Sequence, residues 1–299
     1  MPRIVILHAT LLLLALYSLA VLVQAQTRTI SRPLDVQGHR GARGLMPENT
    51  MPAFEKAIAL GVTTLEMDIY TTQDGVIVVY HDPRLNAKLC AYDDGRRVPK
   101  KHIEQFAYED LANIDCGARR NARFPQQQPV PEARIPTLEQ VLALARDANY
   151  PVRVSIEVKW EKRKNDTAVR EIAQRLVVLI KRYGLTNRSI VQSFHAPVLV
   201  AVAKIEPNIQ RAILVRDPEK YDRVVSESNA TILSPRYDGL DTQDVKRFKA
   251  RNIAVIPWTV NRPADICRLM AWGVDGMISD YPDRVIELHN GGACDGGKQ

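Results

Sequence analysis

Val152-Arg153-Val154-Ser155-Ile156-Glu157-Val158-Lys159-Trp160 is the stretch that decides the fold. Its even positions are apolar and its odd positions are polar, which is the period of a β-strand. Helical patterns flank this stretch at 136–148 and 166–183. Between two helices, the alternation predicts a barrel strand whose apolar side chains pack on the outer helices and whose polar side chains enter the barrel.

Strand and helix patterns alternate along the rest of the chain as well. A strand at 35–38, a helix at 51–60 closed by Gly61, and a strand at 62–70 precede the stretch. Such alternation indicates a parallel sheet, and this many units indicate a closed barrel. The 299 residues suit one α/β barrel, which takes about 250 residues. Later segments are strands at 189–194, 209–215, 231–234, 253–260 and 276–279, and helices at 196–205, 219–226, 241–250, 263–272 and from 282.

The link between the strand at 62–70 and the next apolar run, 76–80, is too short for a parallel crossover. A crossover needs about a dozen residues, so this link with its Asp74-Gly75 predicts a hairpin. A turn centred on Asp74 and Gly75 places Asp68 opposite His81. The hairpin also supplies an extra strand beyond the eight of a regular barrel, so the predicted barrel is irregular.

Three carboxylates are predicted to face one region of the barrel. Glu66 and Asp68 lie two residues apart on one strand and share a face, while Glu157 lies on the polar face of another strand. Two acidic residues with this spacing, without other support, usually lie on a solvent-exposed strand face. Three converging carboxylates without Cys or His ligands suit a hard divalent cation, and the choice between Mg²⁺ and Ca²⁺ stays open.

The chain also carries a series of short polar motifs. In chain order they are His39-Arg40-Gly41, Pro47-Glu48-Asn49-Thr50, Glu66-x-Asp68, His81-Asp82, Ile156-Glu157-Val158-Lys159, Ser193-Phe194, Trp258-Thr259-Val260-Asn261 and Asp275-Gly276-Met277-Ile278-Ser279-Asp280. Together they closely resemble the glycerophosphodiester phosphodiesterase family. The resemblance implies an irregular TIM (β/α)8 barrel with a long insertion after the third strand. It also implies metal-dependent hydrolysis of glycerophosphodiesters to glycerol 3-phosphate and an alcohol, with one divalent cation, Ca²⁺ or Mg²⁺, on the three carboxylates.

The resemblance implies that His39 and His81 are the catalytic acid and base. Histidine has an unperturbed pKa of about 6.5, so it can accept and donate protons near neutrality. Phosphodiester cleavage needs one group that deprotonates the nucleophile and one that protonates the departing alkoxide. The other histidines have no motif support and are interpreted as structural: His8, His102, His195 and His289.

Two cations and an aromatic side chain are the candidate substrate-binding residues. Arg40 and Lys159 would hold the non-bridging phosphate oxygens, because arginine offers two parallel hydrogen bonds and lysine a compact charge. A surface salt bridge is the alternative for each of them. Trp258 would form a wall of the pocket, with packing in the core as the alternative. The same two roles are open to Phe194, for which we predict packing in the core.

Residues 1–25 predict a signal peptide. Arg3 is followed by an apolar run from about residue 9 to residue 23, and Val23-Gln24-Ala25 is a small-residue cleavage site. The run is short for a membrane span, which needs roughly 20 residues, and an uncleaved anchor is the alternative. We expect an exported protein, periplasmic or secreted, with one barrel domain at 26–299 and no stable membrane insertion after cleavage.

All four cysteines follow the predicted cleavage site. An even number of cysteines in an exported protein favours disulfides, and four cysteines allow three pairings. We expect the pairs Cys90–Cys116 and Cys267–Cys294, because each pair is close in sequence and would fasten an irregular region. No Cys-x-x-Cys spacing indicates zinc.

Regular periodicity fails from about residue 83 to residue 136, where prolines, glutamines and charges dominate. Within a compact domain, a loop of this length is usually functional. We predict a surface insertion with little regular structure. It would cover the catalytic mouth and shape the pocket for the alcohol part of the substrate.

A formal net charge of +7 favours anionic partners. Zinc-finger spacing, RNP-type aromatic motifs and dense basic runs are missing from the sequence, so nucleic acid is not a predicted partner. The expected substrate is a small glycerophosphodiester such as glycerophosphocholine or glycerophosphoethanolamine. One alternative is a lysophospholipase D-like enzyme acting on lysolipids, which would need an exposed apolar rim. The other is a non-catalytic module that binds phosphate esters, in which a histidine or a carboxylate would be missing.

Overall fold

The computed structural model describes residues 33–160, 165–291, 293 and 294. The chain divides into one compact unit from Leu34 onward and a preceding unit, residues 1–33. The predicted signal peptide at 1–25 therefore lies outside the described residues. Within the described part, none of the helices has the length and apolar character needed to cross a bilayer.

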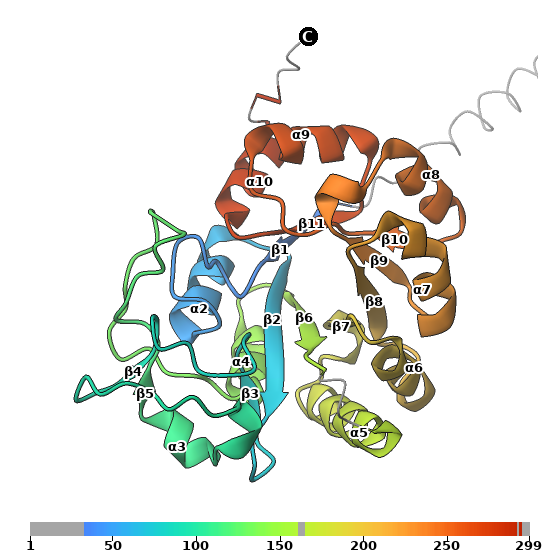
Figure 1. The fold of residues 1–299 in the computed structure, drawn as a ribbon. Helices are drawn as coiled ribbons and strands as arrows, with labels where there is room; N and C mark the ends of the chain where they lie inside the picture. The colour runs from blue at the N-terminus through green and yellow to red at the C-terminus, as the bar shows by residue number, and fades with distance from the viewer. Residues whose placement is uncertain (1–32, 161–164, 292, 295–299) are drawn as a thin grey trace, which may run out of the picture. The chain divides into compact units, whose positions relative to one another are not determined.

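Among the described residues, eight parallel strands form a nearly closed barrel (Figure 1). They pair in the order β10-β9-β8-β7-β6-β2-β1-β11. Hydrogen bonds join the two ends of this order, because Asp275 N donates to Val255 O at 2.9 Å and Ile278 N donates to Pro257 O at 3.0 Å. The predicted TIM barrel is thus confirmed. The strands are β1 (Asp35–Gly38), β2 (Thr64–Thr71), β6 (Arg153–Val158), β7 (Ser189–Ser193), β8 (Gln210–Val215), β9 (Ile232–Pro235), β10 (Ala254–Val255) and β11 (Gly276–Ser279).

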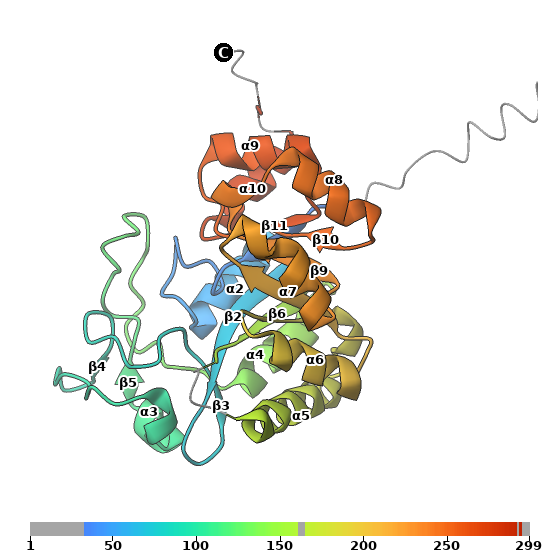
Figure 2. The same cartoon turned by 45° about the vertical axis from the view of Figure 1, so that its right-hand side comes forward.

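Helices surround the barrel and pack their apolar faces on the strands (Figures 1 and 2). Helix α4 shows why the sequence forms them. Its buried residues Leu138, Val141, Leu142 and Ala145 recur at the helical period, and Thr137 caps its start by accepting a hydrogen bond from Gln140 N. The helices are α2 (Met51–Leu60), α4 (Leu138–Asp147), α5 (Asp166–Arg182), α6 (Ala196–Ile205), α7 (Tyr221–Ser228), α8 (Thr242–Ala250), α9 (Pro263–Trp272) and α10 (Pro282–His289).

The alternation in β6 separates packing from chemistry as predicted. Val154, Ile156 and Val158 belong to the hydrophobic core, whereas Glu157 on the opposite face lines a pocket. β2 follows the same rule, since its apolar side chains join the core while Glu66 also lines the pocket. The predicted strand at 253–260 is shorter than expected, because only Ala254–Val255 is regular.

The predicted hairpin is present, but its register differs by one residue. β3 (Ile77–Val79) runs antiparallel to β2, and Tyr80 N donates to Asp68 O at 2.9 Å, so Tyr80 and not His81 lies opposite Asp68. The cause is a loop of odd length. Thr72 N donates to Val76 O, and Gly75 adopts φ +86°, so the turn holds three residues instead of two.

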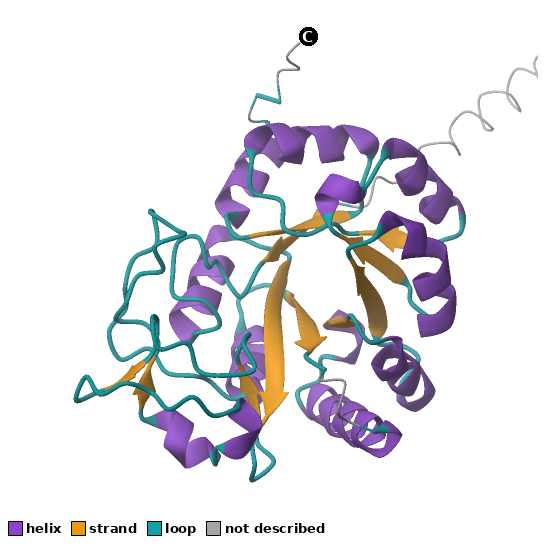
Figure 3. Cartoon of the chain, viewed as in Figure 1, coloured by secondary structure: helices purple, strands orange, loops and turns teal. Residues whose placement is uncertain are grey.

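The predicted insertion after β3 packs around its own apolar cluster, which the sequence pattern did not reveal. Its regular elements are short, namely β4 (Ala91–Tyr92), β5 (Ile114–Asp115) and α3 (Tyr108–Ala112), and loops join them (Figure 3). Apolar side chains from several parts of the insertion pack against one another and are buried. The fully buried members of this cluster within the insertion are Ile103, Leu111 and Ile114.

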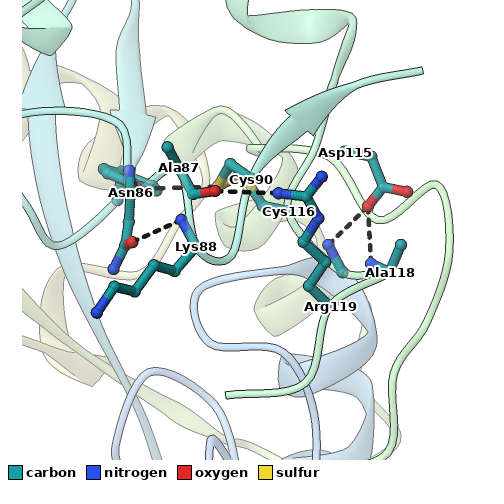
Figure 4. Close-up of a disulfide and its surroundings, with 10 residues drawn as sticks. Asn86, Ala87, Lys88, Cys90, Asp115, Cys116, Ala118 and Arg119 are labelled. Atoms are coloured by element: carbon teal, nitrogen blue, oxygen red, sulfur yellow. Dashed lines mark hydrogen bonds between the residues drawn. A yellow bond between two sulfur atoms is a disulfide. The ribbon is translucent and has the colours of Figure 1, made fainter. Parts of the chain in front are cut away.

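Both predicted disulfides are formed. Cys90–Cys116 joins two parts of the insertion (Figure 4), and Cys267–Cys294 ties α9 to the segment after α10. The sequence separations are 26 and 27 residues, and the first pair lies in the irregular insertion, whereas Cys267 of the second lies within helix α9.

Candidate active site

A pocket of about 820 Å³ lies at the carboxyl ends of the barrel strands. His39 directly follows β1, Phe194 follows β7, and Arg216 follows β8, and all three line the pocket. Active sites of TIM barrels form at this end, because loops after several strands converge there. Residues of the insertion, including Leu89 and Asn121, line the same pocket, which agrees with the prediction that the insertion shapes it.

The three predicted metal-binding carboxylates come together, and two of them, Glu66 and Glu157, line this pocket. Glu66, Asp68 and Glu157 are buried, and one oxygen from each lies within 4.8 Å of the others. The pairing of β2 with β6 brings this about, because it sets Asp68 directly beside Glu157. Buried carboxylate oxygens at such spacing are the donors that a hard divalent cation prefers, so these residues fit the predicted ion.

Burial and neighbouring charges shift the pKa values of these acids in opposite directions. Burial, followed by the negative charges of Asp68 and Glu157, raises the pKa of Glu66 well above its ordinary value. Burial also acts to raise the pKa of Asp68, but the positive charges of Lys159 and Arg40 outweigh it and leave that pKa well below its ordinary value. A bound cation would offset the mutual repulsion of the acids.

The two predicted phosphate-binding cations contact these carboxylates. Lys159 Nζ lies 2.8 Å from Asp68 Oδ1 and 2.7 Å from Glu157 Oε1. Arg40 Nη1 donates to Glu48 Oε1 at 2.6 Å, and its backbone N–H donates to Glu66 Oε2 at 2.8 Å. Arg40 adopts φ +52°, a left-handed conformation that is uncommon for a residue other than glycine and that accompanies this backbone contact.

His39 is held by an acid that sequence reasoning did not single out. Its Nδ1 lies 2.6 Å from Asp280 Oδ1, and Asp280 also accepts hydrogen bonds from Arg43 Nε at 2.5 Å and Asn261 Nδ2 at 2.8 Å. This contact assigns the proton to Nδ1 and the lone pair to Nε2, which lies 3.9 Å from Glu66 Oε2. Burial, followed by the charge of Arg43, lowers the pKa of His39 to about 3, so the imidazole is neutral near pH 7.

His81 lines the same pocket from the end of the hairpin. Its Nδ1 lies 2.7 Å from Asp82 Oδ1, and its side chain is 32% exposed, compared with 12% for His39. The two histidines therefore differ in environment, because His39 is largely enclosed and His81 is partly exposed.

Other polar residues support the carboxylates and were given no role by sequence reasoning. Gln192 Nε2 donates to Glu66 Oε1 at 2.6 Å, and Asn49 Nδ2 donates to Asp68 Oδ2 at 2.9 Å. Their position at the ends of barrel strands was the signal that could have identified them. Asp280 directly follows β11, and Gln192 lies near the end of β7, where residues of TIM barrels gather around the substrate.

The prediction that Phe194 packs in the core is wrong, because its exposure is 42%. The chain turns at the end of β7, so the ring projects at the pocket and meets Trp258 edge to face with centroids 5.6 Å apart. Trp258 lines the pocket as well, and its Nε1 donates to Ser234 O at 2.9 Å.

A TIM barrel whose pocket holds carboxylates, basic residues and two histidines fits the class of phosphate-ester hydrolases. The sequence model of the glycerophosphoryl diester phosphodiesterase family matches residues 39–284, and the chain belongs to this family. It is 30% identical over 257 residues to the glycerophosphodiester phosphodiesterase of Caldanaerobacter subterraneus subsp. tengcongensis, an alignment that covers 85% of this chain and 96% of that relative. The enzyme class predicted from the motifs is thereby confirmed.

Solved structures agree with this assignment. A Silicibacter pomeroyi protein, whose name assigns it provisionally to the same family, superposes with a TM-score of 0.81 at 28% identity and covers 87% of this chain and 94% of its own. An Oleispira antarctica phosphodiesterase, solved with its product sn-glycerol-3-phosphate, superposes with a TM-score of 0.72 at 23% identity, covering 86% of this chain and 96% of its own. The second likeness supports the fold alone.

Proposed function

We propose that this phosphodiesterase uses one divalent cation and two histidines to hydrolyse glycerophosphodiesters to glycerol 3-phosphate and an alcohol. The observation that carries the proposal is the convergence of three buried carboxylates, two of which line the same pocket as His39 and His81. Expected substrates are deacylated phospholipids such as glycerophosphocholine and glycerophosphoethanolamine. The product bound to the Oleispira relative, sn-glycerol-3-phosphate, is the product expected here.

Glu66, Asp68 and Glu157 would hold the cation, either Ca²⁺ or Mg²⁺. When bound, it would offset the negative charge that grows on the phosphoryl oxygens. Arg40 and Lys159, which lie 3.2 Å and 2.8 Å from the Asp68 carboxylate, would contribute positive charge beside the same oxygens. Trp258 would pack against the carbon skeleton of the substrate.

The two histidines would divide the proton transfers. His39 is neutral near pH 7 with its lone pair on Nε2, which suits it to accept the proton of the nucleophile. His81 lies toward the insertion, where the alcohol part would sit, and would protonate the departing oxygen. In the net reaction water supplies the new oxygen on phosphorus, and the bond from phosphorus to the alcohol breaks.

The decisive experiment is hydrolysis of glycerophosphocholine by the wild type and by His39→Ala, with and without a chelator. Release of glycerol 3-phosphate should stop in the chelator and return on addition of Ca²⁺ or Mg²⁺, and His39→Ala should stay inactive. His289→Ala is the matched control and should keep full activity. Undiminished turnover in the chelator would reject the proposed requirement for a divalent cation. An active His39→Ala variant would reject the proposed role of His39 as general base.

The nucleophile can be identified with a modified substrate. Either water attacks phosphorus directly, or the neighbouring glycerol hydroxyl attacks first and forms a cyclic phosphate that water then opens. A glycerophosphocholine analogue without that hydroxyl separates the routes. Retained turnover would exclude an obligatory cyclic intermediate, and lost turnover with retained binding would support one.

A lysolipid substrate is less well supported. The exposed large apolar side chains of the described residues are Val178, Phe194 and Ile205, and of these Phe194 alone lines the pocket. An acyl chain at the mouth would need a wider apolar rim. Turnover of lysophosphatidylcholine above that of glycerophosphocholine would reverse this preference.

We further propose that the protein is exported and that its signal peptide is removed after Ala25. The two disulfides support this, because disulfides persist in oxidising compartments. The mass of the mature chain and fractionation of the producing cells test the proposal. A protein that keeps residues 1–25 and stays with the membranes would instead be anchored.

A further inference from the structure

The mouth of the pocket carries four exposed cations that the proposed reaction does not use. These residues, the outer cations, are Lys88, Arg120, Arg123 and Arg216. Across the part of the chain that the structure describes, none of them forms an ion pair with a carboxylate, and Arg120 donates to a backbone carbonyl instead. The inner cations differ, because Arg40 and Lys159 are paired with carboxylates. Positive charge at the mouth is therefore uncompensated.

Each acid that lines the pocket contacts a group other than the outer cations. Glu66 and Glu157 belong to the cation site, Glu48 pairs with Arg40 at 2.6 Å, and Asp82 contacts His81 at 2.7 Å. An alcohol group that enters the mouth thus meets a positive surface.

Arg216 occupies the place that an ammonium group would otherwise prefer. Its guanidinium carbon lies 4.4 Å from the ring centroid of Phe194 and 5.2 Å from that of Trp258. Such a pair of aromatic faces could bind a quaternary ammonium, but here the protein's own cation covers them. Stacking takes up the face of the guanidinium and leaves its in-plane N–H groups to act as donors to an anion.

Contacts within the insertion restrain the backbone segments that carry the other three cations. Cys90–Cys116 joins the two segments that carry Lys88 and Arg120, and beside it Arg119 Nη1 donates to Ala87 O at 3.0 Å (Figure 4). A preset arrangement loses less conformational entropy when a ligand binds.

The segment that carries Arg123 is also tied to the barrel. Gln127 Nε2 donates to Arg43 O at 2.7 Å and to Met46 O at 3.0 Å, in the loop after β1. The neighbouring Phe124 is buried and packs edge to face on Tyr281. The backbone segment that carries Arg123 is therefore anchored to the loop that follows β1.

We propose that the outer cations form a subsite for an anionic group on the alcohol part of the substrate. The enzyme then prefers glycerophosphodiesters whose alcohol carries a further phosphate to those whose alcohol carries a quaternary ammonium. This inference rests on the proposed function and refines it. Hydrolysis breaks the bond from phosphorus to the alcohol oxygen, water supplies the new oxygen, and the alcohol leaves with its own phosphate intact.

The test compares kcat/KM for three substrates: glycerophosphoinositol 4-phosphate, glycerophosphoinositol and glycerophosphocholine. The first two differ only in the added phosphate, and each releases one glycerol 3-phosphate. We expect the added phosphate to raise kcat/KM about tenfold at low salt, because several exposed charge contacts each add a modest amount. The advantage should shrink as salt screens the charges. Glycerophosphocholine should be the poorest substrate.

Variants assign the preference to the outer cations. The triple variant Lys88→Gln, Arg120→Gln, Arg123→Gln should lower the ratio of kcat/KM between the two inositol esters to about one, by the same contact energies. The matched control Arg97→Gln, an exposed arginine of the insertion outside the pocket, should keep the wild-type ratio. If the triple variant does not fold, Lys88→Gln and Arg216→Gln replace it, each with a smaller loss.

Three results would overturn the inference. The wild type could favour glycerophosphocholine, or the triple variant could keep the wild-type ratio. In the third result the triple variant keeps the ratio and also loses binding to vesicles of anionic phospholipid. The outer cations would then bind a membrane surface and not the substrate. If the wild type hydrolyses none of the three substrates, the proposed function itself is overturned.

Discussion

Asp280→Asn is the substitution that tests most directly how His39 is prepared for catalysis. Asp280 Oδ1 lies 2.6 Å from His39 Nδ1 and 2.5 Å from Arg43 Nε, and the residue is 2% exposed. The amide keeps the shape of the side chain but removes its charge. It also offers an NH2 group that can face the imidazole, which would then carry its proton on Nε2.

Two effects follow, one on the rate and one on stability. A base with its proton on the wrong nitrogen loses the contribution of general base catalysis, so kcat should fall by about 10²- to 10⁴-fold. Arg43 remains buried at 8% exposure and keeps only the more distant carboxylate of Glu48, 3.9 Å away, as an anionic partner. Breaking a buried ion pair from one side costs about 3–5 kcal/mol, so the free energy of unfolding should fall by about that amount.

The pH dependence gives the stability effect a signature. Burial acts to raise the pKa of Asp280, but His39 and Arg43 outweigh it and hold that pKa below its ordinary value. The stabilisation is therefore complete above the unfolded pKa of about 3.9 and is lost as the pH falls through the lower folded pKa. The difference in free energy of unfolding between wild type and Asp280→Asn should be full at pH 7 and vanish in strong acid.

The assay is kcat for glycerophosphocholine together with denaturant unfolding over a series of pH values. Asp283→Asn is the matched control, since it lies three residues further on in the first turn of α10, and should change both quantities little. A variant that unfolds more easily but keeps kcat within about twofold would show that Asp280 is only structural. Loss of a general base would lower kcat by about 10²- to 10⁴-fold.

Three further outcomes are expected. Ca²⁺ or Mg²⁺ should raise the melting temperature of the metal-free wild type, and Glu157→Gln should remove that rise because a ligand is lost; an equal rise in both would reject the carboxylate site. His81→Ala should lower kcat by about 10²- to 10⁴-fold, whereas His195→Ala, which lies outside the pocket, should not; equal kcat values would reject the acid. Replacing Cys90 and Cys116 by Ser should lower the free energy of unfolding by about 3 kcal/mol, because their separation of 26 residues restricts the unfolded chain, and a loss below about 1 kcal/mol would contradict this.

Local patterns were enough to predict the helices and most of the strands. The period of Val152–Trp160 correctly separated the residues that pack outward from those that face the pocket, because side-chain direction in a strand depends only on position. The disulfide pairs were also predicted, since residues close in sequence are close in space. The hairpin register was not, because it depends on whether two or three residues fill one turn.

The sequence by itself determined the barrel, the acids at Glu66, Asp68 and Glu157, and the two histidines, because periodicity and motif order are properties of the chain. Only the tertiary structure decided that Asp280, more than 200 residues away, holds His39. It alone placed Phe194 and Arg216 together at the mouth and gave the insertion a core. The physical reason is that such contacts join segments far apart in the chain, so closure of the barrel, and not local propensity, sets their distances.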